Sequence, residues 1–171
     1  MIEVTGRLRR PRRLKVWQIA GATAALSFGL ASFGSAASAN DITGVWYDDT
    51  GRGAVEIKSC GSSLCGRIVW LREPLKANGQ PFTDELNPKA SRRNRKICGL
   101  QVIGKLERQP DGSYDNGWIY DPKAGKAYNV AVSLKSRNRL AVTGYLGVKM
   151  LGRTLSWKRA PGDLPSCDAS A

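Results

Sequence analysis

Hydrophobic and polar residues alternate with a period of two along most of the chain after residue 40, as expected for β-strands with one buried face. The clearest case is residues 127–135, where Tyr128, Val130, Val132 and Leu134 share one face. Residues 66–71 follow the same rule and would place Ile68 and Trp70 together. Interrupted by turn residues, the pattern predicts further strands at residues 42–47, 54–59, 100–106, 114–120, 140–146 and 154–158.

Eight short strands with hairpin-length links and no amphipathic helix of ten residues predict an all-β fold, an eight-stranded up-and-down antiparallel barrel. A flattened two-sheet sandwich is the alternative. In the barrel, the last strand has only the first left to pair with. The long connection at residues 72–99 contains Pro74, Pro81 and Pro88, and we interpret it as a lid or side loop. A helical turn is expected at residues 88–94, with Asn87 as its N-cap.

The first 39 residues have the order of a secretory signal peptide. A basic head precedes an uncharged, largely apolar run at residues 16–33, and Ala37-Ser38-Ala39 is typical of a cleavage site. A retained membrane anchor is the alternative, because the run approaches the length of about 20 residues that a span needs. We expect cleavage near Ala39 and a single domain at residues 40–171, located in the periplasm or secreted, with no stable membrane span.

Charge and cysteine content fit an exported domain. The whole chain has 27 Lys and Arg against 14 Asp and Glu, and residues 40–171 keep 21 against 13, a net charge of +8. That charge favours anionic surroundings, and no nucleic-acid-binding module is recognisable. Four cysteines in an exported chain indicate disulfides. Cys60 and Cys65 flank a predicted hairpin turn and would pair, which leaves Cys98 with Cys167. Zinc is the alternative, but the cysteine spacing is poor for it and we expect no metal.

The chain contains no histidine, which removes the commonest general base and metal ligand. No P-loop or dinucleotide-binding glycine motif precedes a helix, so we expect no cofactor. The remaining catalytic option is a carboxylate-based hydrolase that uses acidic residues in turns. Asp48 lies before a glycine-containing turn, Asp111 precedes Gly112 and Asp121 precedes Pro122, and aspartate organises backbone hydrogen bonds at such positions. We therefore expect a protein that is not an enzyme.

Ordered motifs resemble the DUF2147 family of exported bacterial proteins of uncharacterised function. They include Gly44-Val45-Trp46, Asp84-x-x-Asn87-Pro88, Gly117-x-Ile119-Tyr120-Asp121-Pro122, Gly144-Tyr145-Leu146-Gly147 and Gly152-Arg153-Thr154-x-x-Trp157-x-Arg159. The resemblance covers residues 42–159 and leaves residues 160–171 as a C-terminal tail. It implies export and a small β-domain, and it supplies no catalytic residue.

A wider resemblance is to lipocalin-like barrels, in which a G-x-W motif on the first strand packs against a basic residue near the end of the last. Gly44, Trp46 and Arg159 fit these roles and would be structural, with the guanidinium stacked on the indole. We therefore expect Arg159 to cover one barrel end, which places function at the other end and at the loop 72–99.

Two functions follow from these observations. The first is binding of a small apolar or amphipathic ligand at the barrel mouth, because an eight-stranded barrel can hold one small ligand. Its candidate ligand-binding residues are the strand aromatics Trp70, Trp118, Tyr120, Tyr128 and Tyr145. The alternative is a cell-envelope interaction module that binds acidic polymers or proteins. Its candidate residues form a basic loop of Arg92, Arg93, Arg95 and Lys96. The aromatic residues could equally form a solid core.

Overall fold

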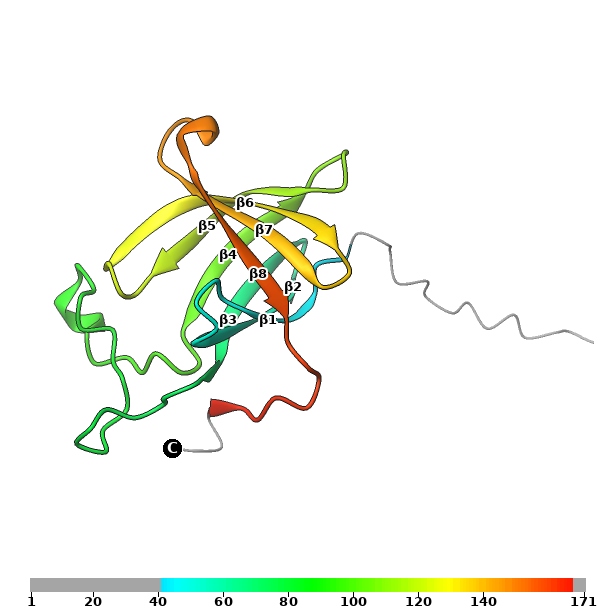
Figure 1. The fold of residues 1–171 in the computed structure, drawn as a ribbon. Helices are drawn as coiled ribbons and strands as arrows, with labels where there is room; N and C mark the ends of the chain where they lie inside the picture. Colours follow the sequence, from blue (N-terminus) through cyan, green and yellow to red (C-terminus); the bar gives the residue numbers. More distant parts are fainter. Residues whose placement is uncertain (1–40, 168–171) are drawn as a thin grey trace, which may run out of the picture. The chain divides into compact units, whose positions relative to one another are not determined.

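Residues 41–167 form a closed antiparallel barrel of eight strands in sequence order (Figure 1). We describe a computed structural model for these residues; the predicted signal peptide at residues 1–39 and residues 168–171 lie outside them. The strands are β1 (Gly44–Tyr47), β2 (Gly53–Cys60), β3 (Ser63–Leu71), β4 (Gln101–Arg108), β5 (Tyr114–Asp121), β6 (Lys126–Ser136), β7 (Arg139–Tyr145) and β8 (Arg153–Arg159). The predicted up-and-down barrel is confirmed, and the sandwich alternative is wrong.

The barrel closes where the sequence analysis expected, between the first strand and the last. β1 pairs antiparallel with β8, with Trp46 opposite Arg159 and Tyr47 opposite Lys158. The Ala160 amide also donates to the Val45 carbonyl at 2.9 Å. This pairing removes the exposed strand edges that an open sheet would present to other chains.

The barrel interior is filled with aliphatic side chains over part of its length. Ile57, Ile103, Leu106, Val130 and Leu140 are each at most 1% exposed. They come from four different strands, β2, β4, β6 and β7, so their burial depends on closure of the sheet. Each large aliphatic side chain buried in this way contributes about 1.5–3 kcal/mol relative to leaving it exposed.

A stacked arginine and tryptophan lie at the barrel end where β1 begins and β8 finishes. The Arg159 guanidinium carbon lies 3.9 Å from the Trp46 ring centroid. Its Nη1 donates to the Thr43 carbonyl at 3.0 Å and its Nε to the Arg137 carbonyl at 2.8 Å. Gly44 has a φ of +113°, and a Cβ there would lie 2.7 Å from Arg159 Nη1. The G-x-W spacing therefore makes room for the guanidinium, and we call this the closed end.

The other barrel end carries the four connections β1–β2, β3–β4, β5–β6 and β7–β8, because successive hairpin turns alternate between the two ends. The β3–β4 connection is the long loop at residues 72–99, which contains isolated bridges between Leu75 and Pro81 and between Thr83 and Lys96. The β7–β8 connection contains a short 3₁₀ turn, η2 (Lys149–Leu151). We call this end the mouth.

The long loop contains a smaller helical turn than the sequence predicts. Only η1 (Ala90–Arg92) forms, and its N-cap residue is Lys89, with no side-chain capping bond. The expected N-cap role of Asn87 is therefore wrong. Its Oδ1 instead accepts a hydrogen bond from the Lys89 amide at 2.9 Å, while its Nδ2 donates to Asp84.

Both disulfides have the pairing derived from the sequence, Cys60–Cys65 and Cys98–Cys167. The first spans the β2–β3 turn at the closed end. The second joins the end of the long loop to the C-terminal tail, across a sequence separation of 69 residues. Within residues 41–167 there is no helix with the length and apolar character to cross a membrane.

Candidate functional site

A cavity of about 810 Å³ opens from the mouth into the barrel. Its inner wall is apolar and comes from inward-facing positions on β2, β3, β4, β7 and β8, represented by Val55, Ile68, Val102, Val142, Leu155 and Trp157. Every one of these side chains is buried or half-buried. The interior is therefore filled towards the closed end and hollow towards the mouth.

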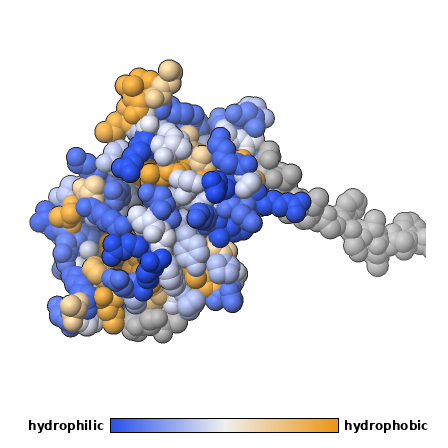
Figure 2. All heavy atoms as spheres, in the orientation of Figure 1, coloured by the Kyte–Doolittle hydropathy of each residue, from blue (hydrophilic) through white to orange (hydrophobic). Residues whose placement is uncertain are grey.

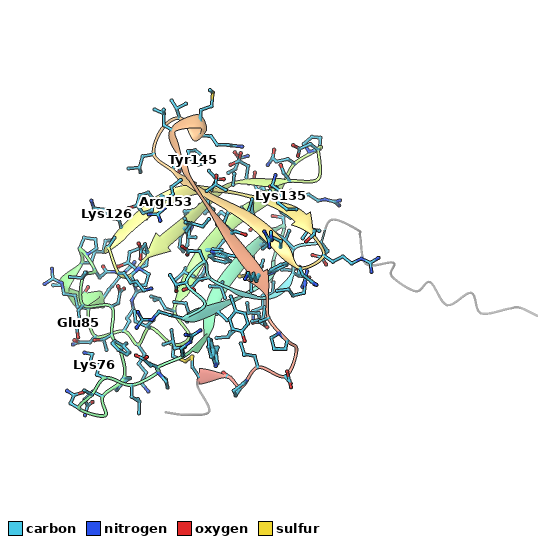
Figure 3. All side chains as sticks on the ribbon, in the orientation of Figure 1. Lys76, Glu85, Lys126, Lys135, Tyr145 and Arg153 are labelled. Carbon is cyan, nitrogen blue, oxygen red and sulfur yellow. A yellow bond between two sulfur atoms is a disulfide. The ribbon has the colours of Figure 1, made fainter. Side chains whose placement is uncertain are left out.

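The mouth of the cavity is polar. Its rim includes Asp49 and Lys123 from the short connections, Asp121 from the end of β5, and Arg153 from the start of β8 (Figure 3). Arg153 lies on the same side of β8 as Leu155 and Trp157, because alternate residues of a strand share a face. Within residues 41–167 its guanidinium makes no hydrogen bond or ion pair.

Gly144 on β7 has no side chain to fill the cavity beside Arg153. The two residues are directly paired across β7 and β8. A Cβ on Gly144 would meet only Tyr128 Cβ at 3.8 Å and Ile119 Cγ2 at 3.9 Å, which are ordinary contacts. A larger side chain would therefore extend into the cavity, so the glycine contributes directly to its volume.

The long loop contributes a third part of the wall and is held by Asp84. This carboxylate is fully buried. It accepts hydrogen bonds from Tyr120 Oη at 2.7 Å, Arg95 Nη2 at 2.8 Å and Asn87 Nδ2 at 2.8 Å. Tyr120 belongs to β5 and the other three residues to the loop. The network therefore ties the loop to the barrel, and it places Phe82, which also lines the cavity, at the mouth.

The charge state of Asp84 follows from these contacts. Burial by itself would raise the pKa of this carboxyl, but hydrogen bonds from Tyr120, Arg95 and Asn87, with the Arg95 charge, lower it below its ordinary value of 3.8. Asp84 is therefore an ionised, fully hydrogen-bonded group. The neighbouring Glu85 forms a surface ion pair with Lys76 (Figure 3).

A second contact fixes the loop on the β5–β6 turn. Gly125 has a φ of +64°, and a Cβ there would lie 2.0 Å from the Leu86 carbonyl oxygen. Only glycine allows this approach without displacing the backbone. Together, the Asp84 network and the Gly125 contact define the position of residues 84–87 at the mouth.

The structure places two of the five candidate aromatic residues on the cavity wall. Tyr128 faces inward on β6, and Tyr120 lies at the mouth with its hydroxyl on Asp84. Trp70 lies outside, contrary to the expectation that it shares a face with Ile68. In the register of β2 and β3, Ile68 faces Val55 but Trp70 faces Ala54, so Val69 is an extra residue that reverses the faces.

The same effect moves Trp118 out of the interior. Between Tyr114 and Gly117, β5 advances three residues while β6 advances two, and Asn116 adopts a φ of +62°. Gly117 and Ile119 consequently face inward, and the Trp118 ring instead covers Gly104, where a Cβ would lie 2.5 Å from it.

Tyr145 also lies outside the cavity. It occupies the outward position beside Gly144, and its Oη donates to Asp115 Oδ1 at 2.9 Å.

The four basic loop residues divide into two pairs. Arg95 binds Asp84, and Arg93 Nε donates to the Asn87 carbonyl at 2.9 Å. Arg92 and Lys96 are exposed, and their side chains make no hydrogen bond or ion pair within residues 41–167. Two of the four are therefore part of the loop's own architecture.

Arg153 was not identified from the sequence, and Gly144 was recognised only as a small residue that could either leave space for a ligand or let strands pack closely. The predicted last strand began at Thr154, one residue too late to include Arg153. Extending the alternation backwards from Trp157 and Leu155 would have placed it on the inner face. No local signal distinguishes Gly144 from a glycine that only permits close strand packing.

Among residues 41–167 there is no group of three or more acidic or cysteine side chains that could hold a metal ion. The turn carboxylate Asp48 has a structural role, because its Oδ1 accepts hydrogen bonds from Thr50 Oγ1 at 2.7 Å and the Arg52 amide at 3.1 Å. Asp84 is fully occupied by its three donors.

Comparison with known proteins agrees with the architecture. The sequence profile of a family described as "Uncharacterized protein conserved in bacteria (DUF2147)" matches residues 44–159. No curated protein matches the chain. Among solved structures, protein HP1028 from Helicobacter pylori, described as belonging to the lipocalin family, is similar at 25% sequence identity and a TM-score of 0.61. The match covers 71% of this chain and 84% of that one.

Proposed function

The chain belongs to the DUF2147 family, and from this premise we propose that it is a non-catalytic protein that binds a small apolar or amphipathic ligand in the barrel cavity. One observation carries the proposal: a closed lipocalin-like barrel contains an apolar cavity of about 810 Å³ that opens at one end. Cavities that bind small molecules are typically about 300–1,000 Å³, mostly apolar, with a few polar groups that orient the ligand.

The apolar inner wall and the polar rim of the cavity match the two ends of an amphipathic ligand. The apolar part of the ligand would lie against Val55, Val102 and Leu155, which removes apolar surface from water on both sides. A polar end would remain at the rim beside Arg153, whose guanidinium is unpaired within the described residues. The loop 72–99 would cover the ligand from one side, since Phe82 and Leu86 line the cavity.

The proposal is tested with 1-anilinonaphthalene-8-sulfonate, an aromatic anion whose emission rises in apolar sites. Gly144→Leu places a side chain in the cavity and should abolish saturable dye binding. Thr143→Leu is the matched control, because Thr143 is the preceding residue of β7 and its hydroxyl bonds to Thr154 on the outer face at 2.8 Å. It should bind dye as the wild-type protein does.

Circular dichroism must show that both variants keep the β-barrel. The proposal fails if a folded Gly144→Leu variant binds dye as tightly as the wild-type protein, because the cavity would then not be the site. Native mass spectrometry of the protein isolated from cell envelopes should also show a bound small molecule, absent from Gly144→Leu.

The absence of catalysis is part of the proposal. The carboxylates best placed in turns are used in structure: Asp48 organises the β1–β2 turn and Asp84 anchors the long loop. Turnover in a broad hydrolase screen, lost on replacement of Asp49 or Asp121 by Asn, would contradict it.

We also propose that the protein works outside the cytoplasm. Two disulfides are typical of an oxidising compartment, and the N-terminal segment has the order of a signal peptide. Intact-mass measurement of the periplasmic protein should give a chain that begins at Asn40. A cytoplasmic protein with reduced cysteines would overturn this assignment.

Binding to acidic envelope polymers or proteins is the second candidate function. The exposed, unengaged side chains of Arg92 and Lys96 favour it. Replacing both by Ser leaves Arg93 and Arg95 in the loop network, so the fold is preserved while the free charge is lost. If this variant stays bound to envelope fractions up to the same salt concentration as the wild-type protein, the basic loop is not the binding site.

A further inference from the structure

A cluster of exposed apolar side chains lies at the tip of the β7–β8 connection. Leu146, Val148, Met150 and Leu151 are 68%, 58%, 93% and 86% exposed. Figure 2 shows this connection as an apolar projection at the top of the view, above a mostly hydrophilic surface. We call these four residues the apolar tip. Single exposed apolar residues are normal on a protein, but a contiguous group usually marks an interaction site.

The apolar tip has a defined structure. The Leu151 amide donates to the Val148 carbonyl at 3.1 Å, and the Gly152 amide to the Lys149 carbonyl at 2.9 Å. Gly152 sits so close to β7 that a Cβ would lie 2.9 Å from the Gly144 carbonyl oxygen.

Two side chains tie the same connection to β5. Lys149 forms an ion pair with Asp115, which also accepts the Tyr145 hydroxyl. Hydrogen bonding to Asp115 raises the pKa of Lys149, so this lysine stays charged at neutral pH. The fold therefore holds Met150 and Leu151 in solvent in a fixed arrangement, and little conformational entropy is lost on docking.

The position of the apolar tip connects it with the cavity. It belongs to the mouth end, and the two strands it joins place Gly144 and Arg153 on the cavity wall. The base of the apolar tip therefore borders the cavity wall, while the contact of Lys149 with Asp115 holds the connection along the outside of β5.

We propose that the apolar tip inserts into the interfacial region of a lipid bilayer that contains anionic lipids, and that it docks the barrel on the membrane through the β7–β8 connection. The size of the tip favours a bilayer over a protein partner, because a stable protein interface takes about 20–30 residues a side. Interfacial insertion requires only a small apolar protrusion aided by basic residues.

Charge supports the choice of an anionic bilayer. Arg153 follows the tip and Lys126 begins β6 at the same barrel end, and neither side chain has a hydrogen bond or ion pair within residues 41–167 (Figure 3). Free cations next to an exposed apolar group attract lipid phosphates at short range. The inference goes beyond the proposed ligand, since docking requires no occupied cavity.

The test measures flotation of the processed protein, isolated from the periplasm, with phosphatidylcholine vesicles that contain or lack phosphatidylglycerol. We expect binding that increases with phosphatidylglycerol and weakens with salt. Met150→Ser combined with Leu151→Ser should reduce the partition coefficient about tenfold or more, because two apolar side chains leave the bilayer. Met150→Leu combined with Leu151→Met is the matched control, and it should bind as the wild-type protein does.

Several outcomes would overturn the proposal. They are equal partition of the serine variant and the wild-type protein, no preference for phosphatidylglycerol, or a dimer that the serine substitutions dissociate, which would assign the tip to a second copy of the chain. Processed chains that begin at Asn40 are compared throughout, so the apolar N-terminal segment does not contribute to vesicle binding. The serine variant should still bind 1-anilinonaphthalene-8-sulfonate without vesicles, so a failure of docking is distinguishable from a failure of the cavity.

Discussion

Removing the Asp84 carboxylate should release the long loop from the barrel. In Asp84→Ala, Tyr120 and Asn87 lose a charged acceptor in a buried setting, while Arg95 can turn to solvent because its side chain is 42% exposed. A hydrogen bond to a charged group contributes about 1.5–3 kcal/mol, and removing one partner of a buried ion pair costs about 3–5 kcal/mol. Since Arg95 is rescued by water, we expect about 3 kcal/mol of lost loop stability.

Hydrogen exchange followed by mass spectrometry measures this effect where it occurs. Backbone amides that donate hydrogen bonds within the loop, such as those of residues 84, 87 and 97, should exchange faster in Asp84→Ala. Amides of β6 and β7 should change little, because the Cys98–Cys167 disulfide and the barrel hydrogen bonds are intact. Glu85→Gln is the matched control: it changes the next residue, whose exposed ion pair with Lys76 contributes little to stability, so loop exchange should change much less than in Asp84→Ala.

Acid should reproduce the substitution in the wild-type protein. The folded-state pKa of Asp84 is lowered, so its contribution to loop stability is complete above the ordinary value of 3.8. It is lost as the pH falls through the lower folded-state pKa. Loop exchange, corrected for the intrinsic rate, should therefore rise on acidification in the wild-type protein and not in Asp84→Ala. Equal loop protection in Asp84→Ala and Glu85→Gln would refute the reasoning.

Three further predictions concern contacts that hold the long loop, the closed end and the C-terminal tail. Gly125→Ala puts a Cβ 2.0 Å from a loop carbonyl oxygen at a φ of +64°, so it should free the loop and give the exchange pattern of Asp84→Ala. Arg159→Ala removes the stacking on Trp46 and two hydrogen bonds, and urea denaturation should show a loss of about 1–3 kcal/mol, with red-shifted tryptophan emission. An unchanged midpoint would contradict the closing role. Cys98→Ser combined with Cys167→Ser opens a 69-residue loop and should cost about 4 kcal/mol in the same assay.

The sequence by itself determined the strands and their order. Period-two alternation is a property of each strand alone, so eight strands could be located. The links between most of them are too short for anything but a hairpin, so consecutive strands were predicted to pair antiparallel. Strand ends moved by a few residues, as for β3, which begins at Ser63 and not at residue 66. The pairing of Trp46 with Arg159 was also predictable, because a short motif at each end of the fold carries it.

The tertiary structure decided which side chains face the cavity. One extra residue in β3 and one in β5 reverse the faces of Trp70 and Trp118. Alternation cannot reveal such a bulge, because the shift exists only relative to the neighbouring strand. These two shifts and the outward position of Tyr145 leave Tyr120 and Tyr128 as the aromatic candidates that line the cavity.

Partners distant in sequence were also beyond local reasoning. Asp84 meets Tyr120 across 36 residues, and both lay in the family-like motifs without any sign that they touch. Exposure of Met150 and Leu151 likewise depends on where the β7–β8 connection projects. Alternation fixes the direction of each side chain relative to its own strand. Cavity volume, burial and exposure depend on which side chains the other seven strands and the long loop place around that position.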